Sequence, residues 1–138
     1  MELNLESLEK AIISFKKAID EYNSDRSNEF VRDAVIQRFE YSYELSTKMI
    51  TRYLSLVSAD PSSINELTFP EVIRKTYTKG ILKNSWDMWK TYRNDRNKTS
   101  HGYDEANAIE IANDVLLFYN EAIFLLEQLQ KRVSNNED

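Results

Sequence analysis

Two segments, one near each end of the chain, repeat their apolar residues at alternating steps of three and four. The first holds this spacing at Leu5, Leu8, Ile12, Phe15, Ile19 and Tyr22. The second holds it at Ile109, Ala112, Leu116, Tyr119, Ile123 and Leu126. Such steps keep side chains on one face of an α-helix but scatter them over both faces of a strand. The spacing therefore predicts two amphipathic helices that pack on a core.

The rest of the chain also favours helices, because it holds only two glycines and two prolines in 138 residues. Sandwiches and barrels need turn residues at short intervals. Between residues 28 and 58 apolar residues occupy more than one stripe, which predicts a central helix with several neighbours. We expect one domain, residues 1–138, that is all-α: an up-and-down antiparallel bundle. Its five helices are predicted at residues 4–22, 28–58, 70–79, 85–95 and 104–132.

Local signals agree with these boundaries. Short polar residues that can cap a helix stand before the last four predicted helices, at Ser27 or Asn28, Thr68, Asn84 or Ser85, and Asp104. Thr68 begins the sequence T-F-P-E, a capping-box pattern with proline in the first turn. Gly80 is placed to end the third helix in the left-handed conformation. The stretch from residue 58 to residue 67 is predicted as a loop.

Composition excludes several classes of protein. No cysteine is present, so disulfides and thiolate metal sites are ruled out. A zinc site would need carboxylates beside the single histidine, and no paired spacing suggests one, so we expect neither a metal nor a cofactor. No apolar run approaches the roughly 20 residues of a membrane span, and the first ten residues do not read as a signal peptide. We expect a cytoplasmic protein with no membrane partner.

Charge is distributed unevenly along the chain. The net charge is −5, yet residues 74 to 98 hold eight basic and two acidic residues. This window is therefore +6 and the remainder −11. A local basic patch is what a phosphate-bearing partner would encounter, although a solvated helix face with dispersed lysines would show the same count.

The stretch R-N-D-R-N-K-T-S-H-G-Y-D, residues 93 to 104, contains His101, the single histidine of the chain, at the predicted junction of the fourth and fifth helices. Arg96 precedes it by five residues and Tyr103 follows by two. Histidine transfers protons near neutral pH, and arginine presents a fork of donors that matches phosphate. The first turn of the fifth helix is a further candidate anion site, and Asn97 is suited to orient a ribose hydroxyl.

These side chains suit cleavage of an RNA phosphodiester without metal. His101 would deprotonate the 2′-hydroxyl or assist the leaving group, and Arg96 would stabilise charge on the phosphate. One histidine per chain makes a two-proton mechanism awkward, so a two-fold dimer that joins two junctions is expected. The alternative is a histidine that caps a helix or faces solvent in a polar loop.

The pattern R-x-x-x-x-H-x-Y, from Arg96 to Tyr103, resembles the motif of HEPN-domain proteins. It is most similar to the HepT-type toxins and to the relatives called nucleotidyltransferase substrate-binding proteins. Residues 32–45 resemble the long second helix of that family, residues 69–82 its short third helix, and residues 86–104 its fourth helix and motif. The resemblance covers most of the chain.

The resemblance implies a dimeric helical bundle in which Arg96 and His101 form a metal-independent ribonuclease site and Asn97 supports it. It implies a partner encoded beside it, a minimal nucleotidyltransferase antitoxin that uses ATP and magnesium to attach AMP to Tyr103. The basic window would then converge on the junction to receive RNA. Two other readings remain: a non-catalytic substrate-binding or docking subunit of the nucleotidyltransferase, and a structural bundle with an accidental motif. The alternative to AMP attachment is that the Tyr103 hydroxyl only forms a hydrogen bond across the dimer.

Overall fold

A computed structural model describes residues 2–99 and 104–135. Within these ranges the chain forms five α-helices and one short 3₁₀ helix, with no strand, which confirms the all-α bundle. The elements in chain order are α1 (Glu6–Ser24), α2 (Glu29–Val57), η1 (Pro61–Glu66), α3 (Phe69–Thr78), α4 (Trp86–Lys98) and α5 (Glu105–Asn135). The predicted helices match the five α-helices, although α4 and α5 each extend three residues further than predicted.

The 3₁₀ helix η1 lies in the segment that was predicted as a loop. Pro61 opens it, and the Asp60 carbonyl accepts from the Ser63 backbone N–H at 3.1 Å. Ile64 is 3% exposed and anchors the turn in the core. A buried side chain and local hydrogen bonds thus order a segment whose composition is that of a loop.

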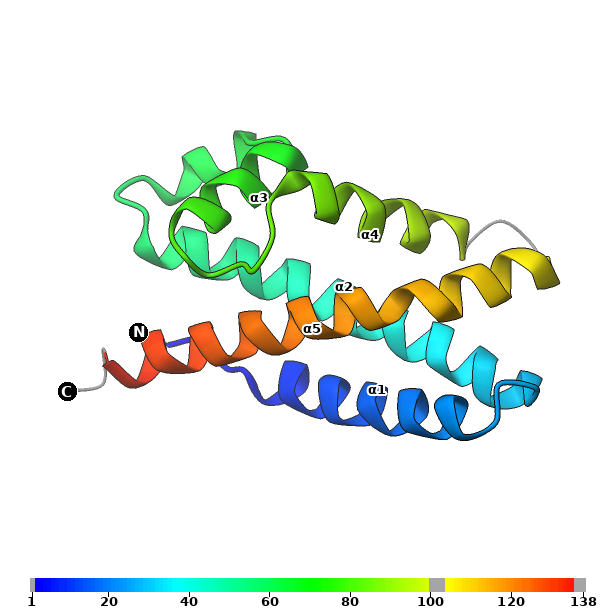
Figure 1. Cartoon of the computed structure of the whole chain (residues 1–138). Coiled ribbons are helices and arrows are strands. Elements are labelled where there is room, and N and C mark those ends of the chain that lie inside the picture. Colours follow the sequence, from blue (N-terminus) through cyan, green and yellow to red (C-terminus); the bar gives the residue numbers. More distant parts are fainter. Residues whose placement is uncertain (1, 100–103, 136–138) are drawn as a thin grey trace.

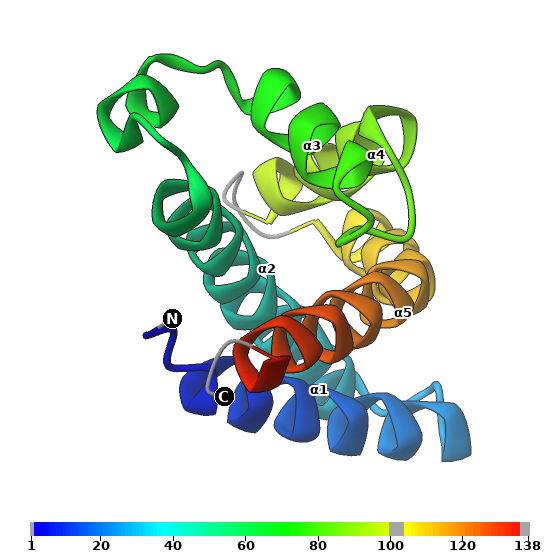
Figure 2. The same cartoon turned by 90° about the vertical axis from the view of Figure 1, so that its left-hand side faces the viewer.

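The four longest helices, α1, α2, α4 and α5, run alternately back and forth along the long axis of the molecule (Figure 1). Helix α2 packs against α1, α5, α3 and η1, so the predicted central helix is confirmed. Seen from the end, α1 lies on one side of α2 and α5, and α3 and α4 lie on the other (Figure 2). The end of α4 and the start of α5 lie at the same end of the bundle as the turn between α1 and α2.

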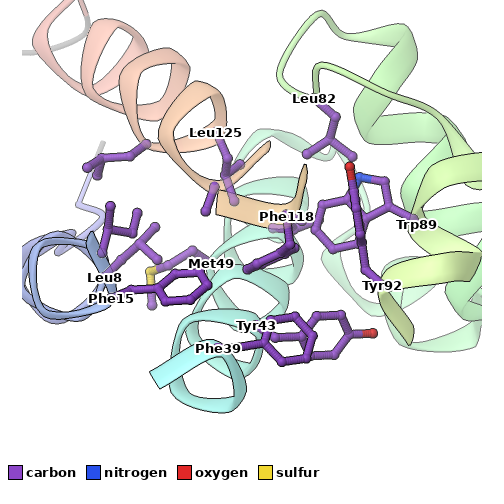
Figure 3. Packing of buried hydrophobic residues seen from close by; sticks show 14 of the residues in the cluster. Leu8, Phe15, Phe39, Tyr43, Met49, Leu82, Trp89, Tyr92, Phe118 and Leu125 are labelled. Atoms are coloured by element: carbon purple, nitrogen blue, oxygen red, sulfur yellow. The ribbon is translucent and has the colours of Figure 1, made fainter. Parts of the chain in front are cut away.

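An aromatic cluster forms the centre of the core, with α2, α4 and α5 each contributing to it (Figure 3). Phe118 of α5 is fully buried and meets the rings of Phe39, Tyr43, Trp89 and Tyr92 at centroid distances from 5.3 to 5.9 Å. Edge-to-face contacts dominate, the arrangement that the ring quadrupole favours. This cluster fixes α4, the helix that carries Arg96, to the two long helices.

Most of the predicted helix ends are confirmed. The Asn28 side chain accepts from the N–H groups of Phe30 and Val31, and Thr68 accepts from Glu71. Gly80 has a φ of +79°, the left-handed conformation expected where α3 ends. Ser85 stands at the start of α4, but its side chain makes no capping hydrogen bond.

The buried face of α5 differs from the predicted one. Ile109 and Leu116, two of the six predicted core residues, are 41% and 47% exposed. Ala112 and Leu126 of the predicted set are buried, but most of the core is built by a neighbouring stripe that holds Ala108, Ile111, Val115, Phe118, Ala122, Leu125 and Leu129. Helix α5 carries two apolar stripes, and the one with Phe118 packs because it completes the aromatic cluster.

Candidate functional site

Ion pairs join the start of α5 to the end of α4 and to α2. Lys98 Nζ lies 3.7 Å from Glu110 Oε1, and Arg32 Nη1 of α2 lies 3.7 Å from Glu105 Oε1. The segment between the two helices, which includes His101 and Tyr103, falls outside the described residues. Their roles therefore stay predictions. Arg96 and Asn97 lie on the last turn of α4, and Asn97 is exposed.

The Arg96 guanidinium is held by two neighbours. Its Nη2 donates to Glu44 Oε1 on α2 at 2.6 Å, and its Nη1 donates to Thr99 Oγ1 at 3.3 Å. The Thr99 hydroxyl donates in turn to the Arg96 carbonyl at 2.7 Å. The hydrogen bond that Arg96 donates to Glu44 raises the pKa of Arg96 above its usual value, with a smaller contribution from the charge of Glu40. The raised pKa keeps the guanidinium charged, and its two hydrogen bonds orient it. The side chain is 26% exposed, so it is also open to a ligand.

Tyr43 connects this arginine to the core. Its ring packs against Trp89 and Phe118, and its hydroxyl points away from the α1 side of the cluster (Figure 3). Burial raises the pKa of Tyr43 to about 12, while the positive charges of Arg93 and Arg96 act to lower it. Arg93 and Arg96 are one helical turn apart on α4, and the charges of both act on this one phenol.

Asp95, next to Arg96, is a buried carboxyl group that sequence reasoning missed. It is 5% exposed. Burial raises its pKa to about 6, helped by Asp114 and Glu110 on α5 and opposed by Lys98. A signal was present in the sequence, because Asp95 continues the three-residue steps of Trp89 and Tyr92 on the buried face of α4.

Glu121 on α5 is a second buried acid that the sequence did not single out. It is fully buried, and its carboxylate accepts from the backbone N–H groups of Lys83 at 2.6 Å and Asn84 at 3.0 Å. Burial raises its pKa, and these hydrogen bonds partly offset the shift. The two N–H groups immediately precede α4, so Glu121 positions the start of the helix that carries Arg96. Its place between Phe118 and Ala122 on an apolar face was the available signal.

The predicted anion site at the start of α5 is already occupied by a side chain of the protein. The Asp104 carboxylate accepts from the N–H groups of Ala106 and Asn107 at 3.0 and 3.3 Å. These two donors are therefore satisfied, and a negative charge covers the helix end. The cap predicted at Asp104 is confirmed, while the anion site predicted at the same place is wrong.

The basic window is dispersed over the molecule. Arg93, Arg96 and Lys98 lie on the second half of α4, but Arg74 and Lys75 lie on α3, toward the opposite end of the bundle (Figure 1). The prediction that the whole window converges on the junction is therefore wrong. Only its α4 members are near the motif.

Two hollows border α4. The larger, of about 950 Å³, follows the second half of α2 and reaches Arg93. The smaller, of about 680 Å³, lies between α2, α4 and α5 and is lined in part by Asp33, Glu40, Asp104 and Lys98. Acidic side chains outnumber basic ones in the smaller hollow, so phosphate is disfavoured there and favoured in the larger one.

The described residues show neither a metal-binding cluster nor a membrane-spanning helix. No group of three or more acidic or histidine side chains there is arranged to hold a metal ion. No helix in the same part of the chain carries an apolar stretch long enough to cross a bilayer.

The fold and the sequence together define the class of protein. Residues 3–131 match the family described as nucleotidyltransferase substrate binding protein like, and the chain belongs to this family. A Haemophilus influenzae protein named "Probable ribonuclease HepT" is 33% identical over an alignment that covers 94% of this chain and 94% of that one. A solved structure from Haemophilus influenzae, described as revealing the fold of a substrate binding domain of a nucleotidyltransferase, superposes with a TM-score of 0.85 at 32% identity. The match covers 92% of this chain and 99% of that one.

Proposed function

We propose that this protein is a HepT-like toxin, a metal-independent ribonuclease that acts through Arg96 and His101. The observation that carries the proposal is the guanidinium of Arg96, oriented by Glu44 and Thr99 yet 26% exposed, five residues before the single histidine of the chain. The similarity to a protein named "Probable ribonuclease HepT" supports it. An oriented, charged and accessible arginine is what stabilisation of a phosphate transition state requires.

The chemistry needs only proton transfer and charge stabilisation. The 2′-oxygen attacks phosphorus, the bond from phosphorus to the 5′-oxygen breaks, and a 2′,3′-cyclic phosphate and a 5′-hydroxyl result. His101 takes the proton from the 2′-hydroxyl or delivers one to the leaving 5′-oxygen. Arg96 donates to the phosphate oxygens as their negative charge grows. Asn97, exposed on the same turn of α4, supports the ribose.

Two proton transfers are needed, and each chain supplies one histidine. The proposal therefore includes a homodimer in which a two-fold axis brings the two ends of α4 together. An isologous contact of this kind pairs His101 of one protomer with His101 of its partner. One acts as base while the other acts as acid.

Tyr103 is the proposed point of control. A neighbouring minimal nucleotidyltransferase, the antitoxin of the pair, would hold ATP and magnesium and transfer AMP to the phenol with release of pyrophosphate. The new phosphodiester adds one negative charge and a nucleoside at Tyr103, a short distance along the chain from Arg96. That charge competes with RNA phosphate for the guanidinium, so modification stops cleavage without unfolding the bundle.

The test of activity uses purified protein, labelled RNA and EDTA. We expect cleavage that EDTA does not stop, with cyclic phosphate ends, and a loss of about 10²–10³ in rate for Arg96→Ala. His101→Ala should be inactive. Arg74→Ala removes a comparable exposed charge on α3 and should cleave as wild type does. Normal cleavage by His101→Ala, or loss of cleavage in EDTA, would refute the assignment.

The test of control is mass spectrometry after co-expression with the neighbouring nucleotidyltransferase. We expect one or more added AMP masses on the peptide that contains Tyr103 and none in Tyr103→Phe. An unmodified peptide in a stable, inactive complex would show that the partner inhibits by covering the site.

The second candidate is a non-catalytic subunit that presents a substrate or a docking face to a nucleotidyltransferase. The ion pair of Arg96 with Glu44 favours it, because at 2.6 Å the guanidinium already has an anionic partner within the chain. The printed description of the family supports the same reading. Wild-type protein that never cleaves RNA, but binds the nucleotidyltransferase in pull-down, would establish it.

A further inference from the structure

A groove along the second half of α2 has no part in the chemistry described above. It has a volume of about 950 Å³, and we call it the α2 groove. Its wall contains three cations, three hydroxyl groups, two aromatic rings and one acid, in addition to apolar and amide side chains. These lining residues are Lys48, Arg52 and Arg93; Thr47, Thr51 and Ser55; Tyr43 and Phe69; and Glu2.

The hydroxyl groups line one face of α2. Thr47, Thr51 and Ser55 follow one another at steps of four, which superposes them on successive turns. Thr47 Oγ1 donates to the Glu44 carbonyl at 3.0 Å, and Thr51 Oγ1 donates to the Thr47 carbonyl at 3.1 Å. Their hydroxyl protons are thereby used, so both side chains face the groove as acceptors.

The opposite wall is formed by α3 and α4. Phe69 opens α3 and packs edge-on against Trp86 at 5.8 Å between centroids. The Arg93 guanidinium of α4 lies over the Phe69 ring, 5.2 Å from its centre. A planar cation stacked on an aromatic ring presents its outer edge to a ligand, which is how arginine contacts phosphate beside a stacked base.

The groove is continuous with the candidate active site. Tyr43 and Arg93 line the groove, and Arg93 lies one helical turn before Arg96 on α4. Glu44, which holds Arg96, lies four residues before Lys48 and eight before Arg52 on the same helix. At 1.5 Å per residue, Arg52 is about 12 Å along α2 from the residue that holds Arg96.

The charge of the groove opposes that of the molecule. Lys48, Arg52 and Arg93 against Glu2 give a groove of +2 on a chain of −5. Within the described part of the chain, none of these three cations forms an ion pair with a carboxylate, whereas Lys98 and Arg96 do. Uncompensated cations in a groove concentrate an anionic ligand there.

We propose that the α2 groove binds single-stranded RNA on one side of the phosphate that Arg96 contacts. Lys48, Arg52 and Arg93 meet backbone phosphates, and the half-buried Phe69 offers ring surface to a base. A single strand is favoured over a duplex because rings reach only bases that have left the stack. The link between groove and cleavage rests on the proposed ribonuclease, but RNA binding by the groove does not.

Binding is measured by fluorescence anisotropy with a labelled single-stranded RNA of about 12 nucleotides. Every ribose carries a 2′-O-methyl group, so the probe cannot be cleaved. The double variant Lys48→Ala/Arg52→Ala should lower the slope of log affinity against log salt by about 1.4, and weaken binding roughly 25-fold at 0.1 M salt. The control Lys17→Ala/Lys131→Ala removes the same charge from exposed positions on α1 and α5 and should retain both values.

A cleavage assay distinguishes the role of the α2 groove from the role of the Arg96–His101 motif. We expect Lys48→Ala/Arg52→Ala to cleave a long RNA more slowly at subsaturating concentration, through KM, and to cleave a dinucleotide as wild type does. Wild-type protein that cleaves neither substrate while the anisotropy difference holds would refute the ribonuclease and leave the groove assignment standing. Equal affinity of the groove and control variants would overturn the groove assignment.

The main competing occupant is protein, either a second copy of this chain or the nucleotidyltransferase. Light scattering of both double variants, with and without that partner, decides between them. Unchanged mass in the groove variant supports the RNA assignment. Loss of dimer or complex in the groove variant alone, with RNA binding retained, would show that the groove is a protein interface.

Discussion

Asp95 should destabilise the folded protein at neutral pH, and its neutral isostere should remove that cost. Its carboxyl group is 5% exposed, and burial, with Asp114 and Glu110, raises its pKa from 3.8 to about 6. In the folded state the proton is held until about pH 6, whereas the unfolded chain releases it near pH 3.8. Between these values the folded state binds more protons, so stability falls as pH rises.

The size of the effect follows from the two pKa values. A shift from 3.8 to about 6 is worth about 3 kcal/mol at 1.36 kcal/mol per pH unit. Below pH 3.8 the buried carboxyl group does not lower the free energy of unfolding. The free energy of unfolding falls between about pH 3.8 and pH 6, and the full decrease is present at pH 7. Asp95→Asn keeps the shape and carries no charge at any pH, so it should be more stable than wild type by up to about 3 kcal/mol at pH 7.

The measurement is urea unfolding of both proteins at pH 4, 5, 6, 7 and 8. The difference in free energy of unfolding should be near zero at pH 4, grow to pH 6 and then level off. Asp87→Asn is the control for charge removal itself, because it takes the same charge from an exposed side chain of the same helix. An Asp95→Asn difference that is flat across the range, or that shrinks as pH rises, would refute the reasoning about burial.

Three further substitutions test how the bundle is held, each by urea or thermal unfolding. Gly80→Ala should cost about 1 kcal/mol, because φ is +79° there and alanine is strained in that region; an unchanged midpoint would contradict this. Asn28→Ala should cost about 0.5–2 kcal/mol by freeing the N–H groups of Phe30 and Val31, whereas Asn28→Asp should not. Phe118→Ala should cost about 3–5 kcal/mol, since the ring is fully buried among four others; a cost under 1 kcal/mol would mean that the cluster does not hold α4.

Spacing and end signals predicted the helices well because both depend on local chemistry. Asn28, Thr68 and Gly80 act within a few residues of themselves, so their neighbours in sequence suffice to interpret them. The burial of Ile64 depends instead on a distant core, which is why η1 was predicted as a loop. Local signals fail where a tertiary contact decides.

Helix α5 shows the same limit on a larger scale. Its two apolar stripes both satisfy three-and-four spacing, and only the position of α2 and α4 selects the one with Phe118. The stripe that holds Leu116 is left half-exposed. Periodicity establishes that a helix is amphipathic, but with two stripes it cannot choose the face.

In the candidate site, too, the residues that the sequence revealed are local, and those that it missed depend on tertiary contacts. The motif from Arg96 to Tyr103 was visible because its residues are close in sequence. The role of Glu44 was not visible in the sequence, because Glu44 is 52 residues from Arg96, although it makes the shortest contact to that guanidinium. Asp95 and Glu121 were also missed, since their importance comes from burial against other helices.

The contact with Glu44 bears directly on whether Arg96 is available to a phosphate. Side chains that are 26% and 57% exposed form an ion pair that solvent screens, and such pairs contribute at most about 1 kcal/mol. A phosphate approaching along the three cations of the α2 groove meets an arginine whose orientation is already set and whose carboxylate partner is free to turn into solvent. In the proposed nuclease Glu44 therefore orients Arg96 in the free protein without making its release costly. The same weakness argues against the pair as the main link between α2 and α4, a role that the buried rings of Tyr43 and Trp89 fill far better.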